Sequence, residues 1–172
     1  MPLKYKALPS QIQLRRMFDY DHNTGFLHWK IKRKGTKGIS STAGHVSRYG
    51  YLIVTIDGEC FKQHRLVWVY VTGKEPVEQI DHVNGNRADN RFENLRECTH
   101  QQNILNTPGW RKKCTPKGVR KEKNCKSSYN ARFMHNGIEF NVGNFPTESE
   151  AVAALTIARE KKHGNFANNG LR

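Results

Sequence analysis

Apolar residues follow a strand-like pattern in two stretches of the first half of the chain and form one continuous run after them. Residues 26–30 (FLHWK) and 51–63 (YLIVTIDGECFKQ) have strand composition, and the Asp-Gly pair inside the second stretch predicts a hairpin turn. The run 64–73 (HRLVWVYVTG) suits strand or helix by composition. Gly73 is a suitable C-terminal stop, which favours a helix.

Polar segments before and after these elements predict caps, turns and loops. Ser10 is placed to cap a short helix through Tyr20. Residues 30–48, rich in Lys, Gly, Ser and Thr, predict a mobile basic loop. Further on, a short approach ending at His82, a turn at Asn84-Gly85 and a return strand over 94–99 predict a second hairpin. Thr99 and Gln102 then form a capping box that starts another helix.

The pattern resets after a segment with two prolines, a glycine and a basic run at 107–116, which is typical of a linker. Asn136-Gly137 lies between two alternating runs and predicts a hairpin. Thr147 and Glu150 form a capping box for an amphipathic helix that Gly164 ends. We therefore expect two domains, 1–106 and 117–168, the second made of three strands and one helix.

The charge balance points to a polyanionic partner. The chain has 29 Lys and Arg against 15 Asp and Glu, a net charge of +14 and a pI near 9.9. Nucleic acid is the leading partner and an anionic membrane surface the second, although no basic amphipathic helix with a wide apolar face supports the membrane. No apolar run reaches about 18 residues and no signal peptide follows Met1. These features predict a cytoplasmic protein that needs no protein partner and no membrane.

The four cysteines predict free thiols rather than a metal cage. They form no C-x-x-C pair, so a zinc knuckle is not expected. Free thiols fit a reducing compartment. Cys114 and Cys125 are the one pair that we keep as a candidate for pairing.

Residues 79–103 concentrate chemistry-bearing side chains: two His, five Asn, two Asp and three Gln. A hairpin closing onto a helix would bring together Asp81, His82, Asn94 and Asn103. Asp81 and Asn103 offer hard oxygens that suit Mg²⁺ or Mn²⁺. His82, on the other face of an extended strand, suits a general base. The pattern favours metal-assisted phosphodiester hydrolysis; the alternative is a set of ordinary loop residues that satisfy backbone groups.

Residues 64–103, through HRLVW, IDHVNGN, DNRFENLRECT and QQN, resemble the HNH homing endonucleases, particularly phage-type members with Asn in place of the last His. The resemblance implies a ββα-metal fold over a core of 64–106 that cuts or nicks DNA with one divalent cation. By that resemblance Asp81 and Asn103 bind the metal, His82 is the general base and Asn94 orients His82 through a hydrogen bond.

Two further residues match the same family. His64 and Arg65 correspond to the start of its HRLV motif. Arg65 is a candidate phosphate ligand, with a helix-surface arginine as the alternative. His64 is a candidate catalytic residue, with a packed histidine as the alternative.

Residues 117–166 are similar to the AP2 DNA-binding domain, through KGVR, YNARF, NGIEF, VGNFPTESEAVAAL, AREKKHG and FANN. That family lays a three-stranded sheet, backed by a helix, in the major groove. Tyr129 stands where many members have Trp. The resemblance and the basic side chains give five candidate DNA contacts: Arg120, Lys121, Lys123, Tyr129 and Arg132.

The sequence therefore predicts an α+β chain with a ββα-metal nuclease domain and an AP2-like domain. The expected function is a Mg²⁺-dependent (or Mn²⁺-dependent), site-directed endonuclease for double-stranded DNA, of phage or mobile-intron origin. The alternatives are a DNA-binding regulator with an inactive HNH domain and, less favoured, an RNA-binding protein, for which no aromatic-rich stacking signature is present.

Overall fold

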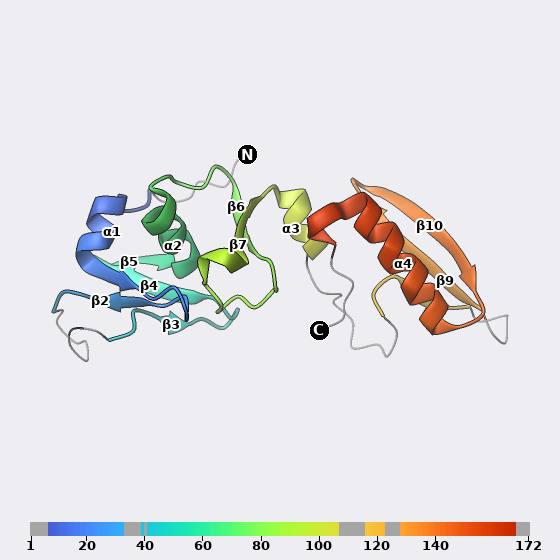
Figure 1. Cartoon of the computed structure of the whole chain (residues 1–172), viewed down its shortest axis with the longest axis horizontal. Coiled ribbons are helices and arrows are strands. Elements are labelled where there is room, and N and C mark those ends of the chain that lie inside the picture. Colours follow the sequence, from blue (N-terminus) through green and yellow to red (C-terminus); the bar gives the residue numbers. More distant parts are fainter. Residues whose placement is uncertain (1–6, 33–38, 40, 107–115, 123–127, 168–172) are drawn as a thin grey trace. The chain divides into compact units, whose positions relative to one another are not determined.

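The computed structural model describes residues 7–32, 39, 41–106, 116–122 and 128–167. The chain divides into two compact units, Met1–Cys98 and Thr99–Arg172 (Figure 1). Each unit combines helices with small antiparallel sheets, so the fold is mixed α+β as the sequence predicted. Most of the predicted linker lies outside the described residues, and the predicted domain limits stay a prediction.

The described residues of the first unit form three antiparallel sheets and two α-helices. The pairs are β1 with β2, β3 with β4 and β5 in that order, and β6 with β7. The elements are α1 Gln11–Met17, β1 Phe18–Tyr20, β2 Leu27–Trp29, β3 His45–Val46, β4 Leu52–Ile56, β5 Glu59–Lys62, α2 Gln63–Thr72, β6 Gln79–His82, the 3-10 turn η1 Phe92–Asn94 and β7 Leu95–Cys98.

Local sequence signals set several of these boundaries as predicted. Asp57 and Gly58 join β4 to β5 with φ of 49° and 81°, the left-handed conformation that a two-residue hairpin turn needs. Gly73 ends α2 with φ of 73°. Ser10 caps α1 in a reciprocal capping box with Gln13.

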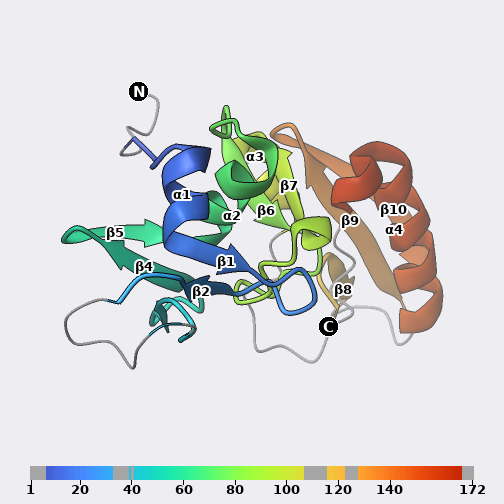
Figure 2. The same cartoon turned by 60° about the vertical axis from the view of Figure 1, so that its left-hand side comes forward.

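Two predicted elements are wrong in part. The helix expected to run through Tyr20 ends at Met17, and Figure 2 shows it leading directly into β1. Phe18 and Tyr20 are buried on either side of exposed Asp19, a period of two that favours pairing with β2. In the loop expected over 30–48, His45–Val46 instead pair with β4.

One core holds the first unit together. It joins α1 and α2 to all three sheets, which fixes the strand ends that carry the polar residues considered below. Its buried apolar side chains are Leu14, Phe18, Tyr20, Leu27, Trp29, Ala43, Val54, Ile56, Phe61, Leu66, Val67, Val69, Ile80 and Leu95.

The second unit is a three-stranded sheet covered on one face by a helix, as predicted. Its elements are α3 His100–Asn106, β8 Val119–Lys121, β9 Tyr129–His135, β10 Ile138–Phe145, α4 Glu148–His163 and the 3-10 turn η2 Gly164–Phe166. The sheet order is β10-β9-β8, and α4 lies along the sheet (Figures 1 and 2). A separate core forms between them from Val119, Ala131, Phe133, Ala151 and Leu155.

The predicted turn of this unit and the N-caps of its two α-helices are confirmed, and of the capping box predicted at α4 the contacts of the described residues include the Thr147 half. Asn136 and Gly137 turn the chain between β9 and β10 with φ of 51° and 79°. Thr147 Oγ1 accepts the Glu150 N–H, 3.2 Å away, at the start of α4. Thr99 and Gln102 form the expected reciprocal capping box at α3. Among the described residues, no helix combines the length and the apolar character needed to cross a membrane.

Candidate active site

The hairpin of β6 and β7 presents two adjacent polar residues on opposite faces. Asp81 lies opposite Arg96 and His82 lies opposite Leu95 in the antiparallel register. Successive side chains of a strand point to opposite faces. Both residues are buried, with 6% of Asp81 and 4% of His82 exposed. The strand therefore gives these two side chains separate surroundings, and each must find partners on its own side.

Asp81 has a cationic partner on the neighbouring strand. Its Oδ2 accepts hydrogen bonds from Arg96 Nη2 at 2.7 Å and from Nε at 3.0 Å. Both side chains are mostly removed from water, so the guanidinium balances the charge of the carboxylate where isolated charge would be costly. Arg96 thereby fixes the orientation of the carboxylate.

His82 lies at one end of a chain of buried amides. Ala43 C=O accepts from Gln63 Nε2 at 3.2 Å. Gln63 Oε1 accepts from Asn90 Nδ2 at 2.8 Å, and Asn90 Oδ1 lies 3.0 Å from His82 Nε2. Gln63 is fully buried and Asn90 is 1% exposed. We refer to Ala43, Gln63, Asn90 and His82 as the amide relay.

The amide relay assigns the tautomer of His82. A backbone carbonyl only accepts hydrogen bonds, so Gln63 must turn its nitrogen to Ala43 and its oxygen to Asn90. Asn90 then turns its own oxygen to the imidazole, and His82 Nε2 must be the donor. In the neutral ring the lone pair consequently lies on Nδ1, which is the basic atom.

The electrostatic surroundings keep His82 neutral over a wide pH range. Burial lowers its pKa below the ordinary 6.5, against the opposing effects of the Asn90 hydrogen bond and the Asp81 charge. A neutral imidazole is the form that accepts a proton. The site therefore suits a general base rather than a fixed cation.

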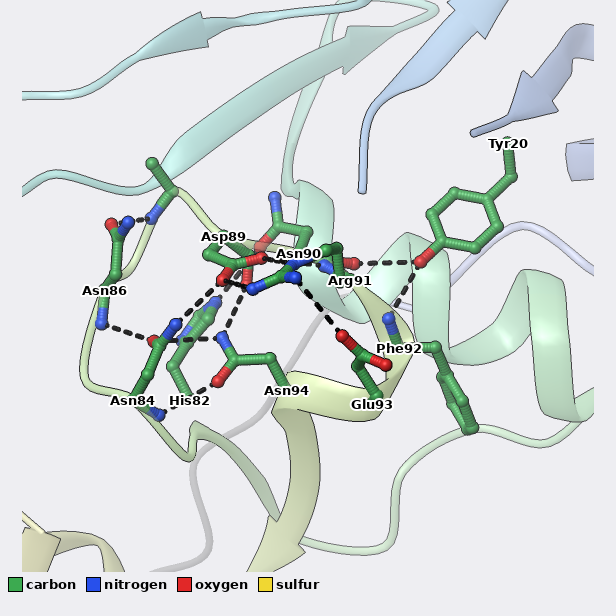
Figure 3. Close-up of polar contacts among 11 residues, drawn as sticks. Tyr20, His82, Asn84, Asn86, Asp89, Asn90, Arg91, Phe92, Glu93 and Asn94 are labelled. Atoms are coloured by element: carbon green, nitrogen blue, oxygen red, sulfur yellow. Dashed lines mark hydrogen bonds and ion pairs between the residues drawn. The ribbon is translucent and has the colours of Figure 1, made fainter. Parts of the chain in front are cut away.

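The loop between β6 and β7 is closed by its own polar side chains (Figure 3). Asn94 Oδ1 accepts the Asn84 N–H at 2.9 Å, and Asn94 Nδ2 donates to Asn84 Oδ1 and to Asp89 C=O. Arg91 donates twice to Asp89 and lowers the pKa of that carboxyl to about 2. These bonds of Asn94 hold the loop, and its predicted hydrogen bond to His82 stays a prediction.

The N-terminal hairpin supports the same loop. Tyr20 Oη donates to Asn90 C=O at 3.1 Å and accepts the Phe92 N–H at 2.8 Å (Figure 3). At Gly25, with φ of 76°, a Cβ atom would lie 2.3 Å from Arg91 N, so a side chain there would displace the loop. The β1–β2 hairpin thus fixes the backbone that carries Asn90.

Asn90, Gln63 and Tyr20 are site residues that the sequence did not identify. Asn90 sits in a polar loop where asparagine ordinarily satisfies backbone groups. Gln63 stands one residue before the family's HRLV motif. Their function depends on contacts across 20, 27 and 70 positions of the chain, and no local spacing encodes such contacts.

His64 and Arg65 are both buried at the start of α2. The His64 ring meets the His82 ring edge to face, with centroids 5.0 Å apart. Burial lowers the pKa of His64 well below 6.5, so His64 is a neutral neighbour of His82. Arg65 Nη1 donates to Glu78 C=O at 3.2 Å, and its predicted contact with phosphate stays a prediction.

The side chains near Asp81 limit the kind of metal ion that could bind there. Within the described ranges, no three His, Cys, Asp or Glu side chains lie close enough together to hold a metal ion. The candidate site predicted here uses one carboxylate and an amide oxygen, a hard donor set that suits Mg²⁺ with bound waters. Asp81 offers the carboxylate of that set, with its Oδ2 bound by Arg96, and its role as a metal ligand stays a prediction. Asn103 lies on α3 in the second unit, and its role rests on motif spacing.

The sheet of the second unit has one face away from α4. Arg120 lies opposite Asn130, and Arg132 lies opposite Asn141. On this face Asn130 Nδ2 donates to Asn141 Oδ1 at 3.1 Å and to Asn144 Oδ1 at 2.9 Å. Arg132 pairs with Glu139 at 3.4 Å. We call this face, with Arg120, Asn130, Arg132, Asn141 and Asn144, the open sheet face.

Tyr129 and Lys121, two further members of the predicted set, do not lie on the open sheet face. The Tyr129 ring packs with the core on the helix side of the sheet, and the Lys121 ammonium lies 5.9 Å from its centroid. Lys123 lies outside the described residues. DNA contacts by these three residues stay predictions. Of the described members of the predicted set, Arg120 and Arg132 lie on the open sheet face.

Comparison with known proteins gives the family. The HNH endonuclease profile matches residues 61–105. The chain is 32% identical over 131 residues to an uncharacterised HNH endonuclease, L560, of Acanthamoeba polyphaga mimivirus, across 75% of this chain and 67% of that protein. This chain belongs to the HNH endonuclease family. As an HNH endonuclease it is a phosphodiester hydrolase, which confirms the predicted enzyme class.

A solved structure of this kind is also similar in part. It describes DNA binding and cleavage by the HNH homing endonuclease I-HmuI, at 21% identity and a TM-score of 0.39, over 89% of this chain and 88% of that chain. The profile of the HNH family ends at residue 105, so the similarity of residues 117–166 to the AP2 domain stays a prediction.

Proposed function

We propose that this HNH endonuclease is a site-directed DNA endonuclease of the homing type that uses His82 as its general base and one Mg²⁺ or Mn²⁺ ion. The amide relay is the observation that carries this assignment. It fixes the proton of the neutral ring on Nε2, so the basic lone pair lies on Nδ1, the atom that we assign to take a proton from water.

The net positive charge of the chain supports the assignment of DNA as its substrate. A net charge of +14 attracts a polyanion and gives a large electrostatic contribution to binding that does not depend on base sequence. Hydrolysis follows when Nδ1 of His82 removes a proton from the water that attacks the phosphorus atom. A divalent metal, which HNH nucleases generally use, would be held by Asp81 and, by motif spacing, Asn103, and would stabilise charge on the leaving oxygen.

The open sheet face is the part of the second unit that we assign to site choice. Arg120 and Arg132 flank an amide cluster on a surface that α4 does not cover. Arginine reads guanine through two hydrogen bonds, and asparagine reads adenine in the same way. A sheet carrying both types is suited to base edges in the major groove.

Supercoiled plasmid tests the function directly. The wild-type enzyme should convert it to nicked or linear DNA in Mg²⁺ and leave it intact in EDTA. His82→Ala should lower the rate by roughly 10²- to 10⁴-fold, the usual contribution of a positioned base, and should leave DNA binding unchanged. His45→Ala, which removes an exposed histidine of the same unit, is the matched control. Cleavage by His82→Ala at the wild-type rate would contradict the assignment.

A further inference from the structure

Two cations from separate elements lie against one tyrosine ring in the first unit. The Lys62 ammonium, at the end of β5, is 4.4 Å from the centroid of the Tyr51 ring. The Arg87 guanidinium carbon, in the loop after β6, is 4.9 Å from the same centroid. Both cationic side chains are exposed and Tyr51 is half-buried. We call Tyr51, Lys62 and Arg87 the cation platform.

The cation platform adjoins the general base. The Tyr51 ring centroid lies 6.1 Å from that of His82 and 5.4 Å from that of His64. The His82 imidazole, which is the proposed proton acceptor, therefore lies near the same tyrosine ring as the two cations. All of these residues belong to the first unit, so the arrangement does not depend on the second.

Tyr51 is held in place by the turn before it. Ser47 N–H donates to Tyr51 C=O at 2.8 Å, and Tyr51 N–H donates to Ser47 Oγ at 3.2 Å. Gly50 N–H donates to Ser47 C=O, and Gly50 adopts φ of 82°, a conformation that glycine adopts without strain. The ring is thus positioned by the backbone before any ligand arrives.

The platform gathers two positive charges that are not paired with a carboxylate in the described part of the chain. Among the residues that the structure describes, neither Lys62 nor Arg87 forms an ion pair with a carboxylate; Arg87 Nη1 donates to Tyr49 C=O at 3.0 Å. Partial loss of solvation around the ammonium lowers the pKa of Lys62, although much of its side chain is exposed, and the charges of Arg65 and Arg87 lower it further. Like charges gathered in this way repel one another, and an anion placed between them would relieve the repulsion.

We propose that Lys62 and Arg87, held on the Tyr51 ring, bind a backbone phosphate of the DNA strand and thereby position the scissile phosphodiester beside His82. The guanidinium can bind two phosphate oxygens at once, and the ammonium adds a mobile point charge. This role rests on the proposed function and identifies residues of that site that hold the substrate.

The salt dependence of DNA binding tests the platform in the full-length protein. Binding of a fluorescent duplex is measured in EDTA, so that no cleavage occurs, over a series of salt concentrations. Lys62→Met and Arg87→Gln should each reduce the steepness of the log–log plot by about 0.9, the value for one lost phosphate contact on duplex DNA. In Mg²⁺ each variant should also lower kcat/KM for plasmid nicking by roughly 10- to 100-fold, as for a lost hydrogen bond to a charged group.

A second arginine–tyrosine pair in the same unit provides the matched control. The Arg15 guanidinium carbon lies 5.6 Å from the centroid of the Tyr70 ring, and neither residue adjoins His82. Arg15→Gln removes one positive charge from the same unit and should leave both the salt slope and kcat/KM at wild-type values. Equal losses in Arg15→Gln and Arg87→Gln would show that net charge alone is responsible and would overturn the proposal.

Arg87→Lys keeps the positive charge and is the control for a loss of activity that is caused only by misfolding. It should keep the wild-type salt slope and lose part of the nicking rate, because an ammonium does not bind two oxygens in the guanidinium geometry. Unchanged slopes and rates in folded Lys62→Met and Arg87→Gln would overturn the proposal. Failure of the proposed function is seen separately, as a wild-type protein that does not nick plasmid in Mg²⁺.

Discussion

At the scale of single residues, the site depends on two buried histidines that stay neutral. His64 and His82 meet edge to face, and burial is the main cause of the lowered pKa of each ring. A proton on either ring would place a cation next to the other imidazole in a poorly solvated position. The arrangement therefore supports the proposed role of His82 as the acceptor of a proton from water.

The pH dependence of cleavage follows from this neutrality. The rate should rise with pH as His82 loses its proton, and the midpoint in kcat/KM should lie below 6.5 because the pKa is lowered in the folded protein. Activity is then complete at neutral pH and is lost as pH falls through the folded pKa. Because the Asn90 hydrogen bond raises this pKa, Asn90→Leu should move the midpoint lower still. A wild-type midpoint above 6.5 would contradict the assignment.

At the scale of elements, the β1–β2 hairpin is a support for the active-site loop. The Tyr20 hydroxyl joins β1 to two backbone groups on either side of Arg91. Tyr20 is 8% exposed, so water does not readily replace these hydrogen bonds. Under the proposed function, the hairpin would contribute to catalysis through the position of Asn90, although it holds none of the proposed reacting groups.

Tyr20→Phe measures this support. The change removes one hydroxyl and leaves the Asn90 carbonyl and the Phe92 N–H without that partner, which should lower the free energy of unfolding by roughly 1–3 kcal/mol. The nicking rate should also fall in conditions where the variant is fully folded, since Asn90 loses a constraint. Denaturant unfolding and plasmid nicking are the two measurements. Tyr70→Phe, in a ring packed against the same core, is the control, and equal effects of the two changes would argue against a specific role for Tyr20.

Elements with strong local signals were predictable from the sequence. The Asp57-Gly58 and Asn136-Gly137 turns need positive φ at both positions, and few residue pairs other than these adopt it readily. The caps at Ser10, Thr99 and Thr147 follow the same logic, because each hydroxyl satisfies a backbone N–H within three residues.

Features that depend on distant partners were not predictable. The helix end at Met17 is set by pairing of Phe18 with Trp29, a choice that the local composition leaves open. Asp81 and His82 were identified from their spacing and chemistry. The amide relay leaves no signature in the sequence, because a buried Gln or Asn cannot be distinguished there from one in a solvated loop. Only the folded chain places Gln63 between Ala43 and Asn90.

At the scale of the whole molecule, charge and sequence preference are separable properties. In the proposed complex with DNA, the net charge of +14, which is spread along the chain, would act on phosphates, which look alike at every base pair. The open sheet face offers Arg120 and Arg132 with an amide cluster, and base edges differ from one pair to the next. Affinity and site choice should therefore respond to different substitutions.

A double variant of the full chain tests this separation. Arg120→Ala with Arg132→Ala should flatten the cleavage preference on a randomised DNA library, since each arginine that reads guanine contributes roughly 1–3 kcal/mol of discrimination. Nicking of generic plasmid should persist. Lys161→Ala, an exposed cation on α4, should keep the wild-type preference. If the double variant cuts the same sites with the same preference, the open sheet face does not choose the site.

The contact of the Gly25 turn with the backbone of Asn90 and Arg91 limits how this nuclease can be exchanged between genes. The family profile covers residues 61–105, but a gene fragment with those limits would leave behind Tyr20, Gly25 and the Ala43 carbonyl that ends the amide relay. A recombinant that inherits such a fragment would keep the recognisable motif and lose the orientation of its histidine. A recombination event that yields an active nuclease would have to transfer the first sixty residues together with the motif as one segment.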